Sequence, residues 1–242
     1  MRGKASLIGC FALLALACVD FRTPGDLRYA RVLAVRATPP RIAPGERARI
    51  ELLVTGDDGV VAVQPPVRVA LATPQPGRPA PPPETAALIV QEGDAWYVNA
   101  PGEAELVAAR GALGLPADAP IPLPLETRAI LSAQERVAEK IVLLGGQAAN
   151  PAIAGVTVNG MALADTAEAL IPAAGDVVLS GAAVGEGQLS FAWFTGFGKV
   201  EKYLQPVATL REQKAGDHGA LVLVVRDEHG GVTWQLASLR VP

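Results

Sequence analysis

The sequence contains little of the chemistry that catalytic and metal sites need. Its 242 residues include two cysteines and two histidines, and aromatic residues make up 5% of the chain. It has no G-x-S-x-G elbow, no H-E-x-x-H motif, no phosphate-binding G-x-x-x-x-G-K-[ST] loop and no Cys-x-x-Cys pair. An enzyme of unrecognised type is therefore the last of three functional hypotheses, and we expect no catalytic residue, no metal site and no cofactor.

Positive charge is also sparse. The chain has 21 Lys+Arg against 24 Asp+Glu, with no basic run. This composition gives no electrostatic surface for nucleic acid and no basic amphipathic helix for a membrane surface. After the apolar run at the N-terminus, no stretch reaches transmembrane length without charges or prolines.

The N-terminus has the layout of a bacterial lipoprotein signal. Arg2 and Lys4 precede an apolar run that is too short to span a bilayer, and small residues lead to Cys18. The pattern predicts a signal peptide at residues 1–17, acylation of Cys18 and a lipidated tether at residues 18–27. Ala15 and Leu16 depart from the usual lipobox order, so an ordinary secretory signal, which would leave Cys18 as a free thiol, stays an alternative.

The positions of the two cysteines favour the lipoprotein signal over an ordinary secretory signal. Cys10 lies in the apolar run and leaves with the signal, so Cys18 has no partner for an internal disulfide. A lone thiol is a liability in an oxidising compartment, whereas an acylated one is an anchor. Removing the signal leaves 19 basic residues against 24 acidic ones, a net charge of −5 instead of −3.

Glycine and proline are abundant, as is typical of a chain with many short β-strands. Glycine (25) and proline (21) separate short runs of Val, Leu and Ile, and residues 31–37 and 47–54 alternate like strands. We expect an all-β protein with two immunoglobulin-like β-sandwich domains in tandem, at residues 28–145 and 150–242. The Gly- and Asn-containing segment 145–151 is the expected boundary.

Three local expectations concern the first domain. Residues 104–109 are read as a strand, and a capping box at Ser132 and Glu135 predicts a short helical turn through Lys140. Residues 74–83 contain six prolines, which indicates an extended, stiff connection rather than a ligand for a proline-recognition domain.

Two regions resemble known bacterial modules. Residues 31–54, RVLAVRATPPRIAPGERARIELLV, resemble the first module of predicted myxobacterial lipoproteins. The stretches NPAIAGVTVNG, AWFT and VVRDEHGGVTW resemble their second module, of the polycystic-kidney-disease (PKD) type or a related immunoglobulin-like type. The resemblance implies architecture more than activity. Such modules carry cysteines in the first domain and this chain has none there, so that domain must hold by packing alone.

The few aromatic residues divide into core and candidate surface. Trp193 stands at the centre of an apolar alternating strand and is expected in the core. Phe194, Phe197 and Tyr203 flank a T-G-F-G turn and are the candidate ligand or partner surface. The alternative is that these three residues cap the end of the sandwich.

The polar candidates are weaker. Asp227 and His229 share a hairpin loop, which we interpret as a solvated turn, as we do His218 beside Asp217. Asp57 starts an acidic turn that lacks the further oxygen ligands calcium requires.

The sequence thus predicts a non-catalytic protein, anchored by lipid on Cys18 to the bacterial cell envelope, at the outer membrane. Its sandwiches would act as structural or protein-interaction modules with an envelope protein as partner. The alternative is an extracellular module that binds polysaccharide or another ligand.

Overall fold

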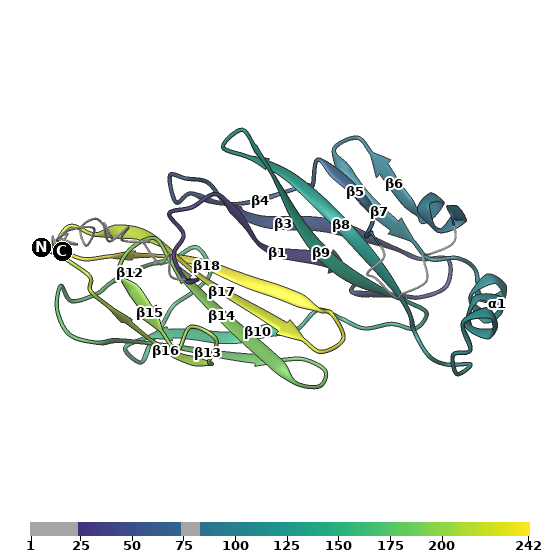
Figure 1. Ribbon diagram of the computed structural model, residues 1–242. Helices are drawn as coiled ribbons and strands as arrows, with labels where there is room; N and C mark the ends of the chain where they lie inside the picture. The colour runs from purple at the N-terminus through teal and green to yellow at the C-terminus, as the bar shows by residue number, and fades with distance from the viewer. Residues whose placement is uncertain (1–23, 74–82) are drawn as a thin grey trace, which may run out of the picture.

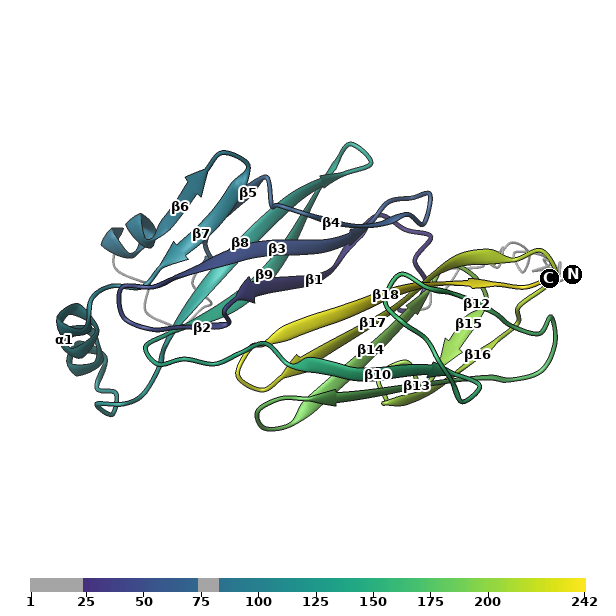
Figure 2. The ribbon, with the colours of Figure 1, turned by 180° about the vertical axis from the view of Figure 1, so that it is seen from behind.

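The computed structural model describes residues 24–73 and 83–242, so the expectations for Cys18 and for residues 74–82 lie outside it. Figure 1 shows two β-sandwiches that overlap along part of their length, with α1 at one end of the molecule. Figure 2 shows the same overlap from behind. Within the described residues, no helix is long and apolar enough to cross a membrane.

In the part of the chain that the structure describes, the first sandwich consists of two sheets and two short helices. One sheet contains, in spatial order, β1 (Arg31–Thr38), β3 (Arg47–Thr55), β7 (Ala95–Asn99) and β6 (Ile89–Glu92), with β4 (Val61–Gln64) paired to β3. The other contains β2 (Arg41–Ile42), β9 (Gln134–Leu144), β8 (Ile121–Leu131) and β5 (Arg68–Leu71). The helices are the 3₁₀ helix η1 (Pro83–Leu88) and α1 (Glu103–Leu113).

The second sandwich is built of strands. Its first sheet contains β11 (Met161–Ala162), β10 (Ala152–Val158), β13 (Val177–Val184), β16 (Val207–Arg211) and β15 (Lys199–Glu201). Its second sheet contains β12 (Glu168–Leu170), β18 (Val232–Arg240), β17 (His218–Asp227) and β14 (Leu189–Thr195).

Both sandwiches have the same strand order. The order β1-β3-β7-β6 opposite β2-β9-β8-β5 is repeated as β10-β13-β16-β15 opposite β12-β18-β17-β14. In each sandwich one short strand pairs in parallel with the last strand, β2 with β9 and β12 with β18, whereas the other pairs are antiparallel. This is the arrangement of immunoglobulin strands A, B, E and D opposite strands C, F and G. The expected fold class, all-β with two immunoglobulin-like sandwiches, is confirmed.

In the core of the second sandwich, packed side chains occupy the place that a disulfide has in antibody domains. Trp193 on β14 is fully buried, and its indole nitrogen donates to the carbonyl of Gln205 at 3.0 Å. A Cβ on Gly181 of β13 would lie 2.7 Å from Leu223 on β17 and 3.1 Å from Trp193. Glycine and leucine therefore stand on the two strands that carry the bridging cysteines in antibodies, and Leu223 fills the space.

Two expectations in the first domain are wrong. Residues 104–109 belong to α1, because the segment is rich in alanine, Glu103 and Glu105 lie in its first turn, and Gly114 ends it in the left-handed region. Ser132 and Ala133 do not start a helix. Both have positive φ and form the two-residue turn of the β8–β9 hairpin, whose register pairs Leu131 with Gln134.

Candidate functional site

The strongest candidate site is the seam between the two sandwiches. A third apolar cluster lies there, separate from the two sandwich cores. Its buried members come from β1, β3 and the segment before β1 on one side and from β14, β17 and β18 on the other: Leu27, Leu33, Ala34, Leu53, Ala192, Phe194, Val222, Val224 and Val232. The two sandwiches therefore share a hydrophobic core, which excludes water as a single-domain core does.

The strands of the seam are apolar on both faces. On β17, Leu221 and Leu223 face their own core while Val222 and Val224 face the first sandwich. On β1, an irregularity in register between Val32 and Ala34 lets three consecutive residues be buried. The uninterrupted run ALVLVV at residues 220–225 was the sequence signal for a sheet covered on both sides, and sequence reasoning missed it.

Three polar links cross the seam. The amide of Asn150 donates to the carbonyl of Ala37 at 2.9 Å and accepts from the backbone N–H of Val232 at 2.8 Å. The guanidinium of Arg226 donates to the carbonyl of Leu33 at 2.8 Å, and the ammonium of Lys140 donates to the carbonyl of Gly230. Such directional hydrogen bonds restrict the two sandwiches to one relative orientation, which apolar contact alone does not do.

Two arginines of β1 cover aromatic rings of the second sandwich. Arg36 lies 3.9 Å from the ring centroid of Trp234 and is held by Glu51 at 2.8 Å. Arg31 lies 5.2 Å from the centroid of Phe194. Both distances are within the range of a cation–π interaction.

The segment before β1 joins the second sandwich as a short added strand. Asp26 makes a parallel bridge with Thr195 at the end of β14. The backbone N–H of Leu27 donates to the carbonyl oxygen of Thr195 at 2.9 Å. The backbone N–H of Thr195 donates in turn to the carbonyl oxygen of Gly25 at 2.8 Å. Leu27 is fully buried, and the hydroxyl of Thr55 on β3 donates to its carbonyl at 2.8 Å. Residues 25–27, the N-terminal clasp, thus bond to both sandwiches.

The carboxylate of Asp26 organises the clasp. It is buried and accepts hydrogen bonds from the backbone and guanidinium of Arg28, while Arg31 donates to the Asp26 carbonyl. Burial by itself raises the pKa of this carboxyl, but the bonds from Arg28 outweigh it, so the pKa of Asp26 lies below its usual value.

The seam also contains a cavity of about 380 Å³. Its walls are residues 32–35 of β1, 138–141 of β9, Arg226, Asp227 and 230–232. Burial lowers the pKa of Lys140 to about 8, with Asp227 opposing and Arg226 adding to the shift. Burial also lowers the pKa of Arg226. Both cations bond to backbone carbonyls, Gly230 and Leu33, on the opposite sandwich.

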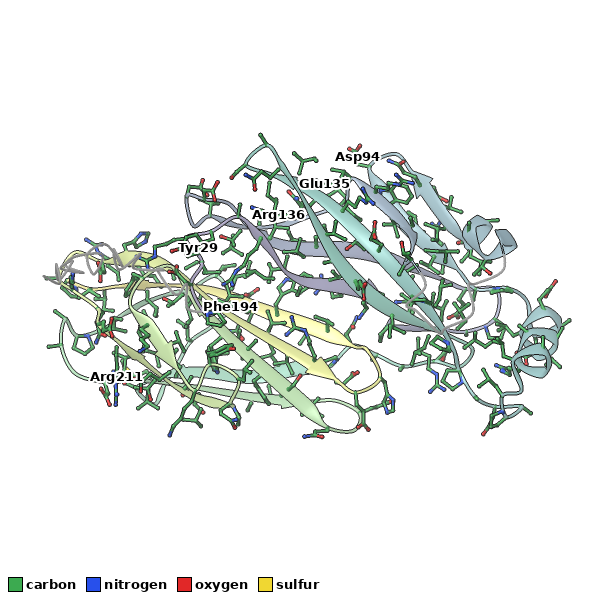
Figure 3. All side chains as sticks on the ribbon, in the orientation of Figure 1. Tyr29, Asp94, Glu135, Arg136, Phe194 and Arg211 are labelled. Atoms are coloured by element: carbon green, nitrogen blue, oxygen red, sulfur yellow. The ribbon has the colours of Figure 1, made fainter. Side chains whose placement is uncertain are left out.

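The candidate surface of Phe194, Phe197 and Tyr203 is not an exposed patch. Phe194 and Phe197 are buried, at 8% and 7% exposure. Phe194 belongs to the shared cluster where the sandwiches meet (Figure 3), because β14 alternates and turns Trp193 inward. Phe197 belongs to the second core, and Tyr203 packs against it. Phe194 and Phe197 therefore serve packing, which corrects the surface expectation for these two residues, whereas Tyr203 is half-buried.

The polar candidates remain apart from one another. His218 and His229 stand at opposite ends of the β17–β18 hairpin, and each faces one glutamate. The carboxylate of Asp227 accepts from the backbone N–H groups of His229 and Gly231, as an acidic turn does. Among the described residues, no group of three or more His, Cys, Asp or Glu could hold a metal ion.

Comparisons with known proteins give solved structures of low similarity. A chimeric titin Z1Z2 tandem is 14% identical, with 88% of this chain and 100% of that one covered and a TM-score of 0.33. The Ig1-2 module of the Drosophila receptor tyrosine phosphatase DLAR is 14% identical, with 88% and 98% covered and a TM-score of 0.33. No protein-family model and no curated protein matches the chain.

One further structure matches a smaller part of the chain. It is a nucleoside hydrolase-related hypothetical protein from Saccharophagus degradans, 14% identical, with a TM-score of 0.34. The match covers 40% of this chain and 26% of that protein, about a quarter of its length. The assignment of the immunoglobulin-like fold rests on the strand order of the two sandwiches.

Proposed function

We propose that this chain is an exported, non-catalytic protein of the bacterial cell envelope, anchored by lipid on Cys18. In this proposal its two immunoglobulin-like sandwiches act as one rigid structural or protein-interaction unit. The observation that carries the proposal is the seam. A shared apolar cluster, three polar links and the N-terminal clasp hold two sandwiches in one arrangement. Rigid presentation of surfaces is what a scaffold or adaptor needs.

Support for the anchor comes from the sequence. An apolar run behind Arg2 and Lys4 ends on Ala17 directly before Cys18, and the mature chain has no second cysteine to pair with it. Stable attachment to a bilayer takes more than one acyl chain, and an acylated N-terminal cysteine supplies them. The partner in this proposal is another envelope protein that binds a surface of the sandwiches.

Metabolic labelling with an alkyne-bearing fatty acid tests the anchor. The full chain should incorporate label and fractionate with envelope membranes, whereas Cys18→Ser should lose both. Cys10→Ser is the matched control, because it removes the other cysteine without touching the acylation site. Unchanged labelling or membrane attachment of Cys18→Ser would overturn the anchor. Circular dichroism of the Cys18→Ser protein should still report folded β-structure.

A further inference from the structure

We infer that the second sandwich, although last in the sequence, is the one that lies beside the bilayer, and that the α1 end of the first sandwich points away from it. The inference rests on the proposed lipid anchor. Along the chain, the N-terminal clasp bonds to the second sandwich at Gly25 before it bonds to Thr55 of the first sandwich at Leu27. Gly25 and Leu27 pair with Thr195 of β14 before Arg31 begins β1.

The N-terminal clasp is buried and packs closely against β14. Gly25, Asp26 and Leu27 are all buried, and Leu27 is fully inside the cluster that both sandwiches share. A Cβ on Gly25 would lie 3.1 Å from the carbonyl oxygen of Trp193, so glycine permits the close approach to β14. Force on the tether therefore acts first on β14 of the second sandwich.

Chain length limits where the anchor can be. Seven steps separate Cys18 from Gly25, so even a fully extended chain places the acylated residue within roughly 25 Å of the clasp. β1 runs away from the clasp for eight residues, about 25 Å. Beyond its end, Arg110 of α1 lies against Gly145, which bonds to Ile42.

The two ends of the molecule also differ. Arg240 near the end of the chain pairs with His218, on the side of the second sandwich where β14 ends at Thr195 (Figure 1). α1 lies at the opposite end in both views (Figure 1, Figure 2). Its outward residues Val107 and Leu113 are more than half exposed. In the inferred orientation this helix stays accessible to other envelope components.

Quenching by headgroup nitroxides tests the orientation. The lipidated protein is reconstituted in vesicles of neutral phospholipid that carry a nitroxide on the headgroup, with one fluorophore on Lys214→Cys or on Ala108→Cys. Acylation of Cys18 leaves the introduced cysteine as the single free thiol. Strong quenching at residue 214 and little at residue 108 is expected. Equal quenching, or stronger quenching at 108, in vesicle-bound protein overturns the orientation.

Two further samples keep the result specific. A long Gly/Ser insertion after Asp20 should leave the protein bound and flatten the difference between the two labels, because a flexible tether no longer fixes which end is near. Gly25→Val should reduce the difference for the same reason, by opening the clasp. If neither the parent nor the insertion variant binds vesicles in a Cys18-dependent way, the lipid anchor itself is wrong, and the orientation falls with it.

Discussion

At the scale of single residues, packing in the second sandwich does the work that a disulfide does in antibody domains. Gly181 and Leu223 stand on the strands that would carry the cysteines, and Trp193 packs against both. Trp193 was predictable as a core residue from its place in an alternating strand. The role of Gly181 was not, because glycine leaves no mark of its packing in the hydrophobic pattern.

Gly181→Ala should therefore destabilise the protein by about 1–3 kcal/mol, since the added methyl collides with Leu223 and overpacks the core. Equilibrium urea unfolding measures the change. Gly155→Ala is the matched control: it also lies in a strand of the same sandwich, and a Cβ there meets nothing within 4 Å. Equal effects of the two substitutions would contradict the packing role of Gly181.

Lys140 makes stability depend on pH. Its pKa in the folded protein is about 8, below the ordinary value of 10.5. Below pH 8 the Lys140 amine is protonated in both the folded and the unfolded protein. The folded protein then bears the full free-energy cost of burying the ammonium group. As pH rises from 8 to 10.5 the folded state loses the proton first, so stability rises, by at most about 3 kcal/mol.

Lys140→Met removes this contribution. The free energy of unfolding of the parent should rise relative to that of Lys140→Met between pH 7.5 and pH 10, as measured by urea unfolding at several pH values. Other groups titrate in the same range, but they cancel in the difference between the two proteins. A difference that stays constant with pH would show that Lys140 is not buried as a cation.

Asp26 also makes stability rise with pH, but in the acidic range. Its pKa lies below the usual value, so its stabilising effect is full above the ordinary pKa of an aspartate, about 4, and is lost as pH falls. Asp26→Asn should destabilise the protein at pH 7 and have less effect at pH 3, again by urea unfolding. An equal effect at both pH values would mean that the charge of Asp26 does not hold the clasp.

At the scale of elements, the sequence predicted the strands of the second sandwich well and failed at two places in the first. Alternation and Gly-rich loops indicated β10, β13, β14 and the β17–β18 hairpin. The sequence did not predict helix α1, because five of the six residues 104–109 are apolar and resemble a short strand, although their alanines favour a helix. The β8–β9 turn was missed because Ser-Ala carries no hairpin signature, and tertiary pairing overrode the capping box.

The β8–β9 turn is accordingly a place where stability can be gained. Ser132 and Ala133 have φ of 48° and 60°, a conformation that Asn-Gly adopts more readily. Replacing the pair by Asn-Gly should stabilise the protein by about 0.5–1 kcal/mol. Thermal unfolding of the variant measures this gain. A loss of stability would contradict the two-residue turn.

At the scale of the whole molecule, the seam makes two domains one body. The two sandwiches could be predicted from the sequence, but their contact could not. An apolar cluster shared by two domains shows in the sequence only as strands that are apolar on both faces. Phe194 illustrates this (Figure 3): from the sequence it was a candidate for a ligand surface or for a cap on the end of its own sandwich, whereas the neighbouring sandwich covers it. By contrast, Arg211 lies on the far side of the second sandwich, paired with Asp176.

Leu33→Asp should separate the sandwiches, because a carboxylate in the shared cluster loses its hydration, at a cost of more than about 2 kcal/mol, unless the seam opens. Each sandwich keeps its own core, so unfolding followed by calorimetry should change from one transition to two. Val178→Asp is the control, since this valine is 44% exposed on the outer face of the second sandwich. It should leave the single transition unchanged.

If the two sandwiches form one rigid body, the distance between a site on the first and a site on the second has one narrow distribution. Pulsed electron paramagnetic resonance on mature Cys18→Ser protein, spin-labelled at Asp94→Cys in the first sandwich and Glu186→Cys in the second, reports the distribution of that distance. If the sandwiches are rigidly joined, the distances form a single population as narrow as that of a pair within one sandwich, Glu186→Cys with Lys214→Cys. A broad or multiple distribution between the sandwiches would contradict it.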